Sequence, residues 1–247
     1  MKTRLDKLLV ERGLVPTRER AQALILAGRV LVSEQKQDKP GASIPADAPI
    51  RLLGSDLRYV SRGGLKLEAA LAHWHIDLRH RFCLDVGGST GGFTDCMLQH
   101  GAARVLAIDT GYGQIAQTLR DDPRVTLMER TNARLLNPGD LPPGISFLAV
   151  DVSFISATLV LPPVVQAILQ APATGVETVV LIKPQFEAGR ERVGKGGIVR
   201  DPAAHQFAID RVRACVEKIG GTNLDTIDSP ITGAEGNHEF LLHALWP

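Results

Sequence analysis

The sequence has few cysteines, no long apolar run and almost no net charge, and each of these absences narrows the class of protein. Its three cysteines form no close-spaced pair of the kind that a disulfide framework or a zinc site needs: Cys83, Cys96 and Cys215. The apolar stretch 159–169 is broken by Pro162, Pro163 and Gln166, and no stretch approaches the roughly 20 residues that cross a bilayer. The first residues contain no apolar signal core. We therefore expect a protein of the reducing cytoplasm rather than an integral membrane protein.

Composition and charge distribution indicate a folded chain with a basic end. Of the 247 residues, 44% are hydrophobic and 22% are charged, which is the ordinary globular balance and not that of a disordered chain. This length suits one large domain, or a small domain plus a medium one. Residues 1–31 contain seven basic and three acidic residues, a net charge of +4, whereas the 21 basic and 24 acidic residues that follow give −3. A basic end is typical of a polyanion-binding attachment, although a solvated helix face gives the same pattern.

The first 56 residues read as a small α+β domain. Leu5, Leu8 and Leu9 fall on one helical stripe that ends before Gly13, and a second helix follows Pro16 and Thr17. Strands are expected over 29–32 and 50–53. The segment 35–49, rich in Lys, Asp, Gly and Pro, reads as a loop between them.

From about residue 81 onward, short apolar runs alternate with amphipathic segments. The expected strands are 82–86, 105–108, 125–128, 147–152 and 179–182, followed by a helix over 202–219 and two further strands over 222–231 and 239–246. Parallel strands need crossover connections, and these are usually helices. The alternation therefore predicts an α/β fold with a doubly wound, mostly parallel sheet.

A glycine-rich turn directly after the first of these strands is the strongest chemical motif. Such a turn at the carboxyl end of a strand is where an open α/β sheet binds ligands. Ser89 stands where a dinucleotide fingerprint needs glycine, so a nicotinamide cofactor fits poorly, whereas a carboxylate before the turn is the pattern of S-adenosylmethionine sites. A tight turn without a ligand is the alternative. The candidate cofactor residues in this motif are Asp85, Gly87, Ser89, Thr90, Gly91, Gly92 and Phe93.

Polar residues at the ends of later strands extend this candidate site. Asp109, about 20 residues beyond the turn, can accept hydrogen bonds from the two hydroxyls of an adenosine ribose, although it could be only a turn residue. Asn132 is a weaker candidate for the adenine edge. Asp151 and Lys183 end neighbouring strands of a doubly wound sheet and would meet beside the cofactor, either as catalytic groups or as an ion pair that caps the strands.

Two other motifs are weaker. Residues 189–196 imitate a phosphate-binding loop, but Gly196 lacks the hydroxyl that would hold Mg²⁺, so a mobile basic loop that closes over a substrate is favoured over an inert surface loop. His73 and His75 have no partner at metal-ligand spacing, and we predict no metal site.

The whole pattern resembles one family, the hemolysin A or TlyA-type ribosomal RNA 2′-O-methyltransferases. The most distinctive matching segments are 60–66, 111–114, 129–134, 151–156 and 183–187, together with the glycine-rich motif. The resemblance implies an RNA-binding domain of the ribosomal S-four type over 1–56, an interdomain linker over 57–61 and an FtsJ-like methyltransferase domain over 62–247. That domain is a Rossmann-like sheet whose last strand is antiparallel. The linker departs from the family pattern, because Tyr59 stands where tryptophan is frequent.

The resemblance also assigns roles to individual residues. It implies a catalytic tetrad that falls on Lys66, Asp151, Lys183 and Glu239, although spacing alone cannot bring the first and last of these into the site. The implied RNA-binding residues are Arg4, Lys7, Arg18, Arg20, Arg29 and Arg62.

The expected activity is transfer of the methyl group of S-adenosylmethionine to a ribose 2′-hydroxyl of ribosomal RNA, with Lys183 steering the hydroxyl proton. Within the resembled family, short-ended members look like the type confined to a cytidine of the large subunit, and we expect that substrate here. The partner is ribosomal RNA or a ribosomal subunit, with no membrane partner, and the sequence does not predict an oligomeric state. A non-catalytic RNA-binding or ribosome-assembly factor and a membrane-active hemolysin are the rival classes.

Overall fold

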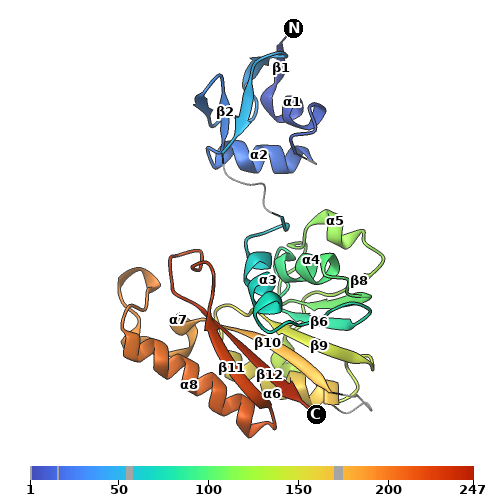
Figure 1. The fold of residues 1–247 in the computed structure, drawn as a ribbon, viewed down its shortest axis with the longest axis vertical. Coiled ribbons are helices and arrows are strands. Elements are labelled where there is room, and N and C mark those ends of the chain that lie inside the picture. Colours follow the sequence, from blue (N-terminus) through green and yellow to red (C-terminus); the bar gives the residue numbers. More distant parts are fainter. Residues whose placement is uncertain (1, 16, 54–57, 170–174) are drawn as a thin grey trace. The chain divides into compact units, whose positions relative to one another are not determined.

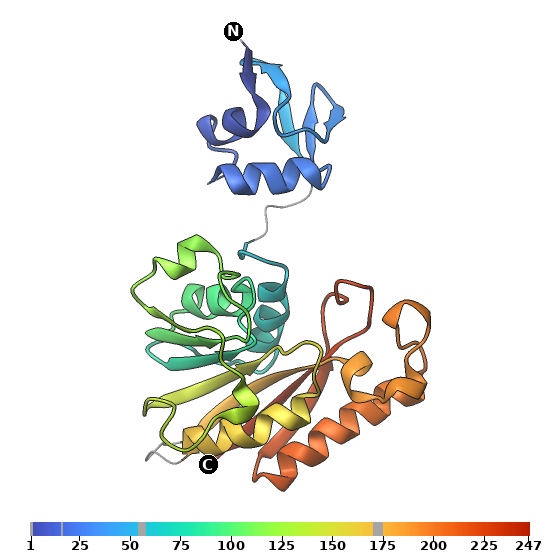
Figure 2. The same ribbon diagram turned by 180° about the vertical axis from the view of Figure 1, so that it is seen from behind.

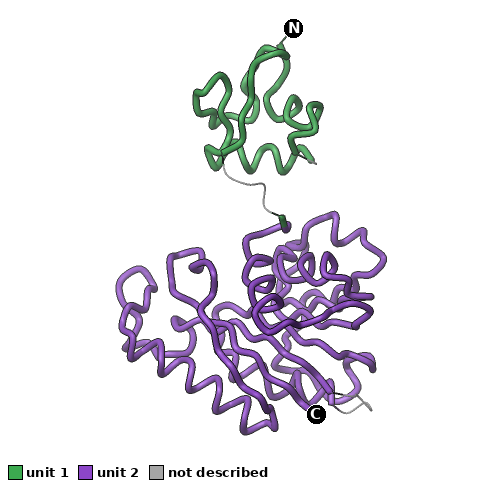
Figure 3. The backbone as a smooth tube through the Cα atoms, viewed as in Figure 1, with its two compact units in different colours: residues 1–58 green, residues 59–247 purple. Residues whose placement is uncertain are grey.

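The chain folds into two compact units, and each is described here by itself. The computed structural model describes residues 2–15, 17–53, 58–169 and 175–247. Unit 1 comprises residues 1–58 and unit 2 comprises residues 59–247 (Figure 3). Tyr59, which lies within the predicted linker 57–61, is only 2% exposed and packs in the core of unit 2.

The described residues of unit 1 form two helices and two small antiparallel sheets around one apolar core. Its elements are β1 (Lys2–Arg4), α1 (Leu5–Glu11), α2 (Arg18–Leu26), β2 (Val30–Val32), β3 (Gln35–Gln37), β4 (Ser43–Pro45) and β5 (Ile50–Leu52). Both predicted helices and the strands at β2 and β5 are present. The core includes the predicted stripe Leu5, Leu8 and Leu9 and, from α2, Leu24 and Ile25.

The prediction of a loop over 35–49 is wrong in part, because this segment contains β3 and β4. Strand β3 forms a hairpin with β2 through Ser33 and Glu34, which both have positive φ angles, of 50° and 62°. Strand β4 pairs with β1 at the start of the chain. Each of these strands has only three residues, and β3 is entirely polar, so neither has the alternating apolar pattern that predicts a strand.

Unit 2 is a seven-stranded sheet with helices on both faces (Figures 1 and 2). Its strands are β6 (Phe82–Val86), β7 (Arg104–Ile108), β8 (Val125–Met128), β9 (Ile145–Val150), β10 (Val176–Ile182), β11 (Thr222–Asp228) and β12 (Phe240–Trp246). Its helices are α3 (Gly63–His73), α4 (Gly92–Gln99), α5 (Gln117–Arg120), α6 (Ala157–Leu169), α7 (Pro184–Glu187) and α8 (Pro202–Lys218), with short 3₁₀ turns at Ala133–Leu135, Arg190–Arg192 and Lys195–Gly197.

The strand order is β11-β12-β10-β9-β6-β7-β8. Strands β6 to β10 are mutually parallel, and β12 runs antiparallel to both of its neighbours. The prediction of a mostly parallel sheet with an antiparallel last strand is therefore confirmed. One apolar cluster joins α6 and α8 to one face of the sheet, and a second joins α3 and α4 to the other. Every residue of β6 is buried, as expected of a parallel strand covered on both faces.

Among the described helices, none is both long and apolar enough to span a membrane.

Candidate active site

The candidate residues gather at one edge of the unit 2 sheet. Asp109, Asp151 and Lys183 directly follow β7, β9 and β10, whose carboxyl ends lie at the same edge because the strands are parallel. Glu239 directly precedes β12, which is antiparallel to β10, so it reaches this edge too; Phe240 pairs with Ile182. From β6 the chain adds β7 and β8 on one side of that strand and then returns to add β9 on the other side, so the strand order changes direction between β6 and β9. Ligands bind at such switch points in open α/β sheets.

The glycine turn after β6 brings two backbone segments into close contact. Gly87 has a φ of +92°, and a Cβ atom built on it would lie 2.3 Å from the carbonyl oxygen of Asp151. No other residue type fits there without moving the segment that carries Asp151. Gly91, at the start of α4, has a φ of +96°, and a Cβ there would lie 2.2 Å from Leu119. Gly91 therefore serves the packing of the turn.

Two cavities adjoin at this turn, where both are lined by Gly87 and Asp151. The larger, of about 530 Å³, is also lined by Asp109, Asn132 and Phe154. Its volume lies within the range of about 300–1,000 Å³ that is usual for small-molecule sites. The smaller, of about 270 Å³, has walls that include Arg62, Lys66, Thr90, Gly92, Phe93 and Lys183. A ligand that spans both cavities would pass the junction of the glycine turn with Asp151.

Asp109 is held in place by the backbone on both sides of it. Its carboxylate accepts hydrogen bonds from the backbone N–H of Ser89 and of Gly111, each at 2.7 Å. A carboxylate has about four lone-pair positions, so each oxygen can still accept a ribose hydroxyl from the larger cavity. Asn132 lines the same cavity, and its side-chain oxygen accepts a bond from the Arg134 backbone N–H at 3.1 Å.

Asp85 lies beneath the turn and lines neither cavity. It is fully buried, and burial, reinforced by the negative charge of Asp151, raises its pKa to about 7. One carboxylate oxygen accepts a bond from Thr94 at 2.6 Å, and the other has no hydrogen-bond partner among the described residues. A buried, unsatisfied oxygen next to the turn can make an indirect or water-mediated contact to the cationic ammonium of S-adenosylmethionine.

The four tetrad candidates form two ion pairs. Lys183 Nζ lies 2.6 Å from Asp151 Oδ1, and it donates to the hydroxyl of Ser153 at 2.7 Å. Lys66 Nζ, from α3, lies 2.5 Å from Glu239 Oε2. Glu239 lines neither cavity and is 2% exposed, so it contacts the site through Lys66.

The structure adds residues to the site that the sequence did not single out. Ser153 lines both cavities and bonds to Lys183, and its only sequence signal is its place two residues after Asp151. Phe154 lines the larger cavity with 91% of its surface exposed and a φ of +64°, an unusual conformation for a bulky residue. Its ring centroid lies 5.6 Å from that of Phe186, so the exposed ring is supported from one side.

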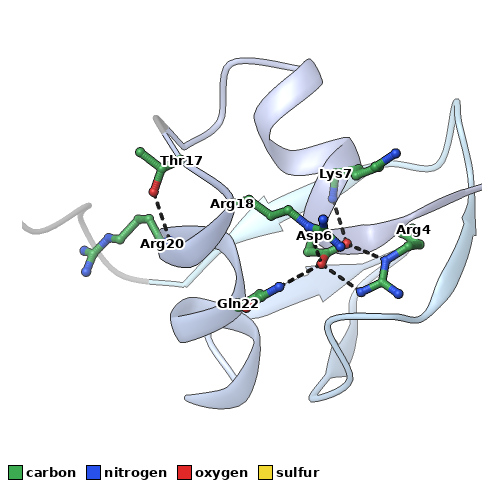
Figure 4. Close-up of polar contacts among 7 residues, drawn as sticks. All are labelled: Arg4, Asp6, Lys7, Thr17, Arg18, Arg20 and Gln22. Atoms are coloured by element: carbon green, nitrogen blue, oxygen red, sulfur yellow. Dashed lines mark hydrogen bonds and ion pairs between the residues drawn. The ribbon is translucent and has the colours of Figure 1, made fainter. Parts of the chain in front are cut away.

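The candidate RNA-binding residues are divided between the two units. Arg62 lines the smaller cavity of unit 2. The other five belong to unit 1: Arg4, Lys7, Arg18, Arg20 and Arg29. Arg4 and Arg18 both bond to the carboxylate of Asp6, which the sequence did not single out, and Arg29 donates to the backbone oxygen of Leu53 at 2.8 Å (Figure 4 shows the Asp6 contacts).

The sheet order, the glycine turn and the paired cavities define a Rossmann-like methyltransferase. S-adenosylmethionine is the cofactor of this class, and the residues around the glycine turn fit it. The chain belongs to the FtsJ-like methyltransferase family, whose model matches residues 59–245, and residues 3–47 match the S4 domain. The family resemblance inferred from the sequence is thereby confirmed.

Known proteins resemble this chain over most or all of its length. YqxC of Bacillus subtilis is 51% identical over 247 residues, which cover 100% of this chain and 86% of that protein. The 16S/23S rRNA (cytidine-2′-O)-methyltransferase TlyA of Mycobacterium tuberculosis is 40% identical, with 98% and 89% covered. The 23S rRNA (cytidine-2′-O)-methyltransferase TlyA of Campylobacter jejuni is 35% identical, with 76% and 71% covered. A solved structure of a hemolysin homologue from Streptococcus thermophilus has a TM-score of 0.76 and 43% identity, with 99% and 88% covered.

Proposed function

We propose that this enzyme methylates the 2′-hydroxyl of a cytidine ribose in ribosomal RNA. The observation that carries the proposal is the placement of Lys183, which is ion-paired with Asp151 and bonded to Ser153. It lies in the wall of the smaller cavity, which adjoins the larger cavity that we assign to the cofactor. The cofactor supplies an electrophilic methyl group on a cationic sulfur. The protein has to position the ribose hydroxyl and manage its proton.

Lys183 is suited to orient the attacking oxygen. As an ammonium it has three N–H donors, of which Ser153 accepts one, while Asp151 lies beside it in an ion pair. Another N–H can donate to the ribose 2′-oxygen, which aligns the hydroxyl and stabilises the negative charge that develops on it. Asp151, a carboxylate in the same cavity wall, can accept the hydroxyl proton.

Lys66, which also lines the smaller cavity, and its ion-pair partner Glu239 complete the tetrad. Lys66 is 8% exposed and Glu239 is 2% exposed, so each compensates the charge of the other where water has little access. We assign Lys66 to the substrate side, where its ammonium can contact the ribose or a phosphate, and Glu239 to holding Lys66 in place.

The exposure of Phe154 favours a nucleic acid over a small molecule as the substrate. Phe154 lines the larger cavity and is 91% exposed, so its ring is open to a nucleobase, and stacking of this kind contributes about 1–3 kcal/mol per base. A ribose whose base leaves the RNA stack to lie on Phe154 would bring its 2′-hydroxyl toward Ser153 and Lys183.

The large ribosomal subunit is the substrate that we propose, because 23S rRNA is named as a substrate of both TlyA relatives. A ribosomal RNA substrate supports the cytoplasm as the compartment in which we propose that the protein works. Purified large and small subunits, incubated separately with the protein and S-adenosylmethionine tritiated at its methyl group, test the choice. We expect tritium in the large-subunit RNA and background counts in the small-subunit RNA. Efficient labelling of the small subunit would refute the restriction to the large one.

A further inference from the structure

One carboxylate in unit 1 is buried at the centre of a cluster of donors. Asp6, in the first turn of α1, is 0% exposed. Its two oxygens accept hydrogen bonds from Arg4 Nε at 3.0 Å, Arg4 Nη2 at 2.9 Å, Arg18 Nε at 2.9 Å, Gln22 Nε2 at 3.0 Å and the Lys7 backbone N–H at 2.9 Å (Figure 4). Because Arg4 binds with two parallel bonds, its guanidinium plane is fixed relative to the carboxylate.

The two guanidinium groups lie half in solvent, although the carboxylate beneath them is buried. The side chains of Arg4 and Arg18 are 49% and 45% exposed. Arg4 uses its Nε and Nη2 atoms toward Asp6, and Arg18 uses only Nε. Each guanidinium has five N–H donors, so N–H groups of both remain beyond those that contact Asp6.

The contacts also keep Asp6 ionised. The bonds from Arg4, aided by Gln22 and Arg18, hold the pKa of the carboxyl well below its usual range against the opposing effect of burial. A permanent negative charge under two arginines lowers the net positive charge of this surface. A surface built only to attract phosphate by charge would not contain it.

We propose that Asp6 is a positioning residue that fixes Arg4 and Arg18 as a preformed pair of guanidinium groups for RNA phosphates. The proposal rests on the proposed function, because it takes ribosomal RNA as the ligand of unit 1. Ordering two free arginine side chains on binding costs rotamer entropy for each of them. Asp6 fixes them before RNA arrives, so less of that cost falls on the binding step.

The direction in which Asp6→Asn changes RNA affinity distinguishes this positioning role from simple electrostatic attraction. Asparagine has the same shape and adds one unit of positive charge to the surface. If charge alone governs binding, the variant binds RNA more tightly. If Asp6 positions the arginines, the variant binds more weakly in spite of its greater positive charge, because an amide cannot accept the two parallel bonds of Arg4.

Filter binding of the full-length protein to a radiolabelled large-subunit rRNA transcript provides the measurement. We expect Asp6→Asn to raise the Kd for RNA about tenfold. This corresponds to about 1.4 kcal/mol, which is close to the contribution of one charge-assisted hydrogen bond. The matched control is Asp38→Asn, which makes the same chemical change at an exposed position of the same unit and should bind as tightly as the wild type or slightly more tightly.

Three further variants keep the test decisive if Asp6→Asn destabilises unit 1. Arg4→Lys, a change at a half-exposed side chain, retains the charge but removes the planar fork, and it should also weaken binding. In the double variant Arg4→Ala/Arg18→Ala, adding Asp6→Asn should cause no further loss, because Asp6 then has no arginine to position. A purely structural role would give an additional loss instead.

Binding by Asp6→Asn that equals or exceeds that of the wild type would overturn the positioning role, as would unchanged binding by Arg4→Lys or an additive loss in the triple variant. If the wild type methylates and binds the transcript while these results are obtained, only this inference fails. If the wild type neither binds nor methylates the RNA, the proposed function fails with it.

Discussion

Replacement of Asp109 by alanine should weaken cofactor binding about 100-fold while the fold survives. The carboxylate offers an acceptor to each ribose hydroxyl, and a hydrogen bond to a charged group contributes about 1.5–3 kcal/mol. Because water can enter the vacated space, we take the lower value for each bond, which gives about 3 kcal/mol, or about 100-fold in Kd.

The cost to folding should be small enough for the domain to stay folded. Asp109→Ala also removes the acceptor for the backbone N–H groups of Ser89 and Gly111. Both lost bonds end on a charged carboxylate, but Ser89 is exposed and Gly111 is half-buried, so water can satisfy both N–H groups and each loss lies at the lower end of about 1.5–3 kcal/mol. The unfolding free energy should fall by no more than about 3 kcal/mol.

Isothermal titration with S-adenosylhomocysteine measures the affinity, and urea unfolding measures the stability. Asp109→Asn should give an intermediate Kd, because its amide retains one acceptor oxygen. Asp121→Ala, at an exposed position just after α5, is the control and should leave the Kd unchanged. A Kd for Asp109→Ala within threefold of the wild-type value would show that Asp109 only shapes the turn.

Four other changes test separate parts of the molecule. Lys183→Ala should abolish methyl transfer and leave cofactor affinity nearly intact, as measured by tritium transfer and calorimetry; near-normal turnover would disprove its role. Phe154→Ala should raise the KM for RNA about tenfold, from the loss of one base stack, with an unchanged cofactor Kd, whereas a weakened cofactor Kd would assign the ring to the cofactor adenine. Deletion of residues 1–56 should preserve cofactor binding, weaken RNA binding and lower the logarithmic salt slope by roughly 0.7–0.9 per lost phosphate contact; undiminished methylation would contradict an RNA-binding role for this segment. The carboxyl of Asp85 has a pKa of about 7 in the folded protein against an ordinary value near 3.8. As the pH rises, the unfolded chain releases this proton first, so the contribution of Asp85 to the free energy of unfolding falls between about pH 4 and 7. Asp85→Asn should flatten this part of a plot of unfolding free energy, measured in urea, against pH, and an unaltered plot would contradict the raised pKa.

The parts of the fold that could be predicted are those with a local pattern of adequate length. The strands predicted at 82–86 and 125–128 have those bounds in the structure. The first is wholly buried, whereas the second, at the edge of the sheet, is mostly half-buried and has Thr126 exposed. The strand predicted at 147–152 ends at Val150, which places Asp151 just beyond it. Strands β3 and β4 were missed because three polar or mixed residues become a strand only through their partners β2 and β1.

The candidate site shows the same division. Asp109, Asp151 and Lys183 could be found because each follows a recognisable strand. The Asp6 cluster could not, because its contacts to Arg18 and Gln22 join α1 to α2 across 12 and 16 residues, a spacing that no single helix produces. Nor does the sequence reveal the positive φ of Phe154.

Mass-spectrometric mapping of ribosomal RNA tests the central proposal most directly. Ribosomal RNA lacking the modification is incubated with the protein and S-adenosylmethionine deuterated at its methyl group, then digested to nucleosides and to fragments. We expect one deuterated 2′-O-methylcytidine, located in the large-subunit RNA and absent when Lys183→Ala replaces the wild type. A deuterated methyl group on a base, or no deuterium in the RNA while the cofactor is bound, would contradict ribose methylation as the function of this protein.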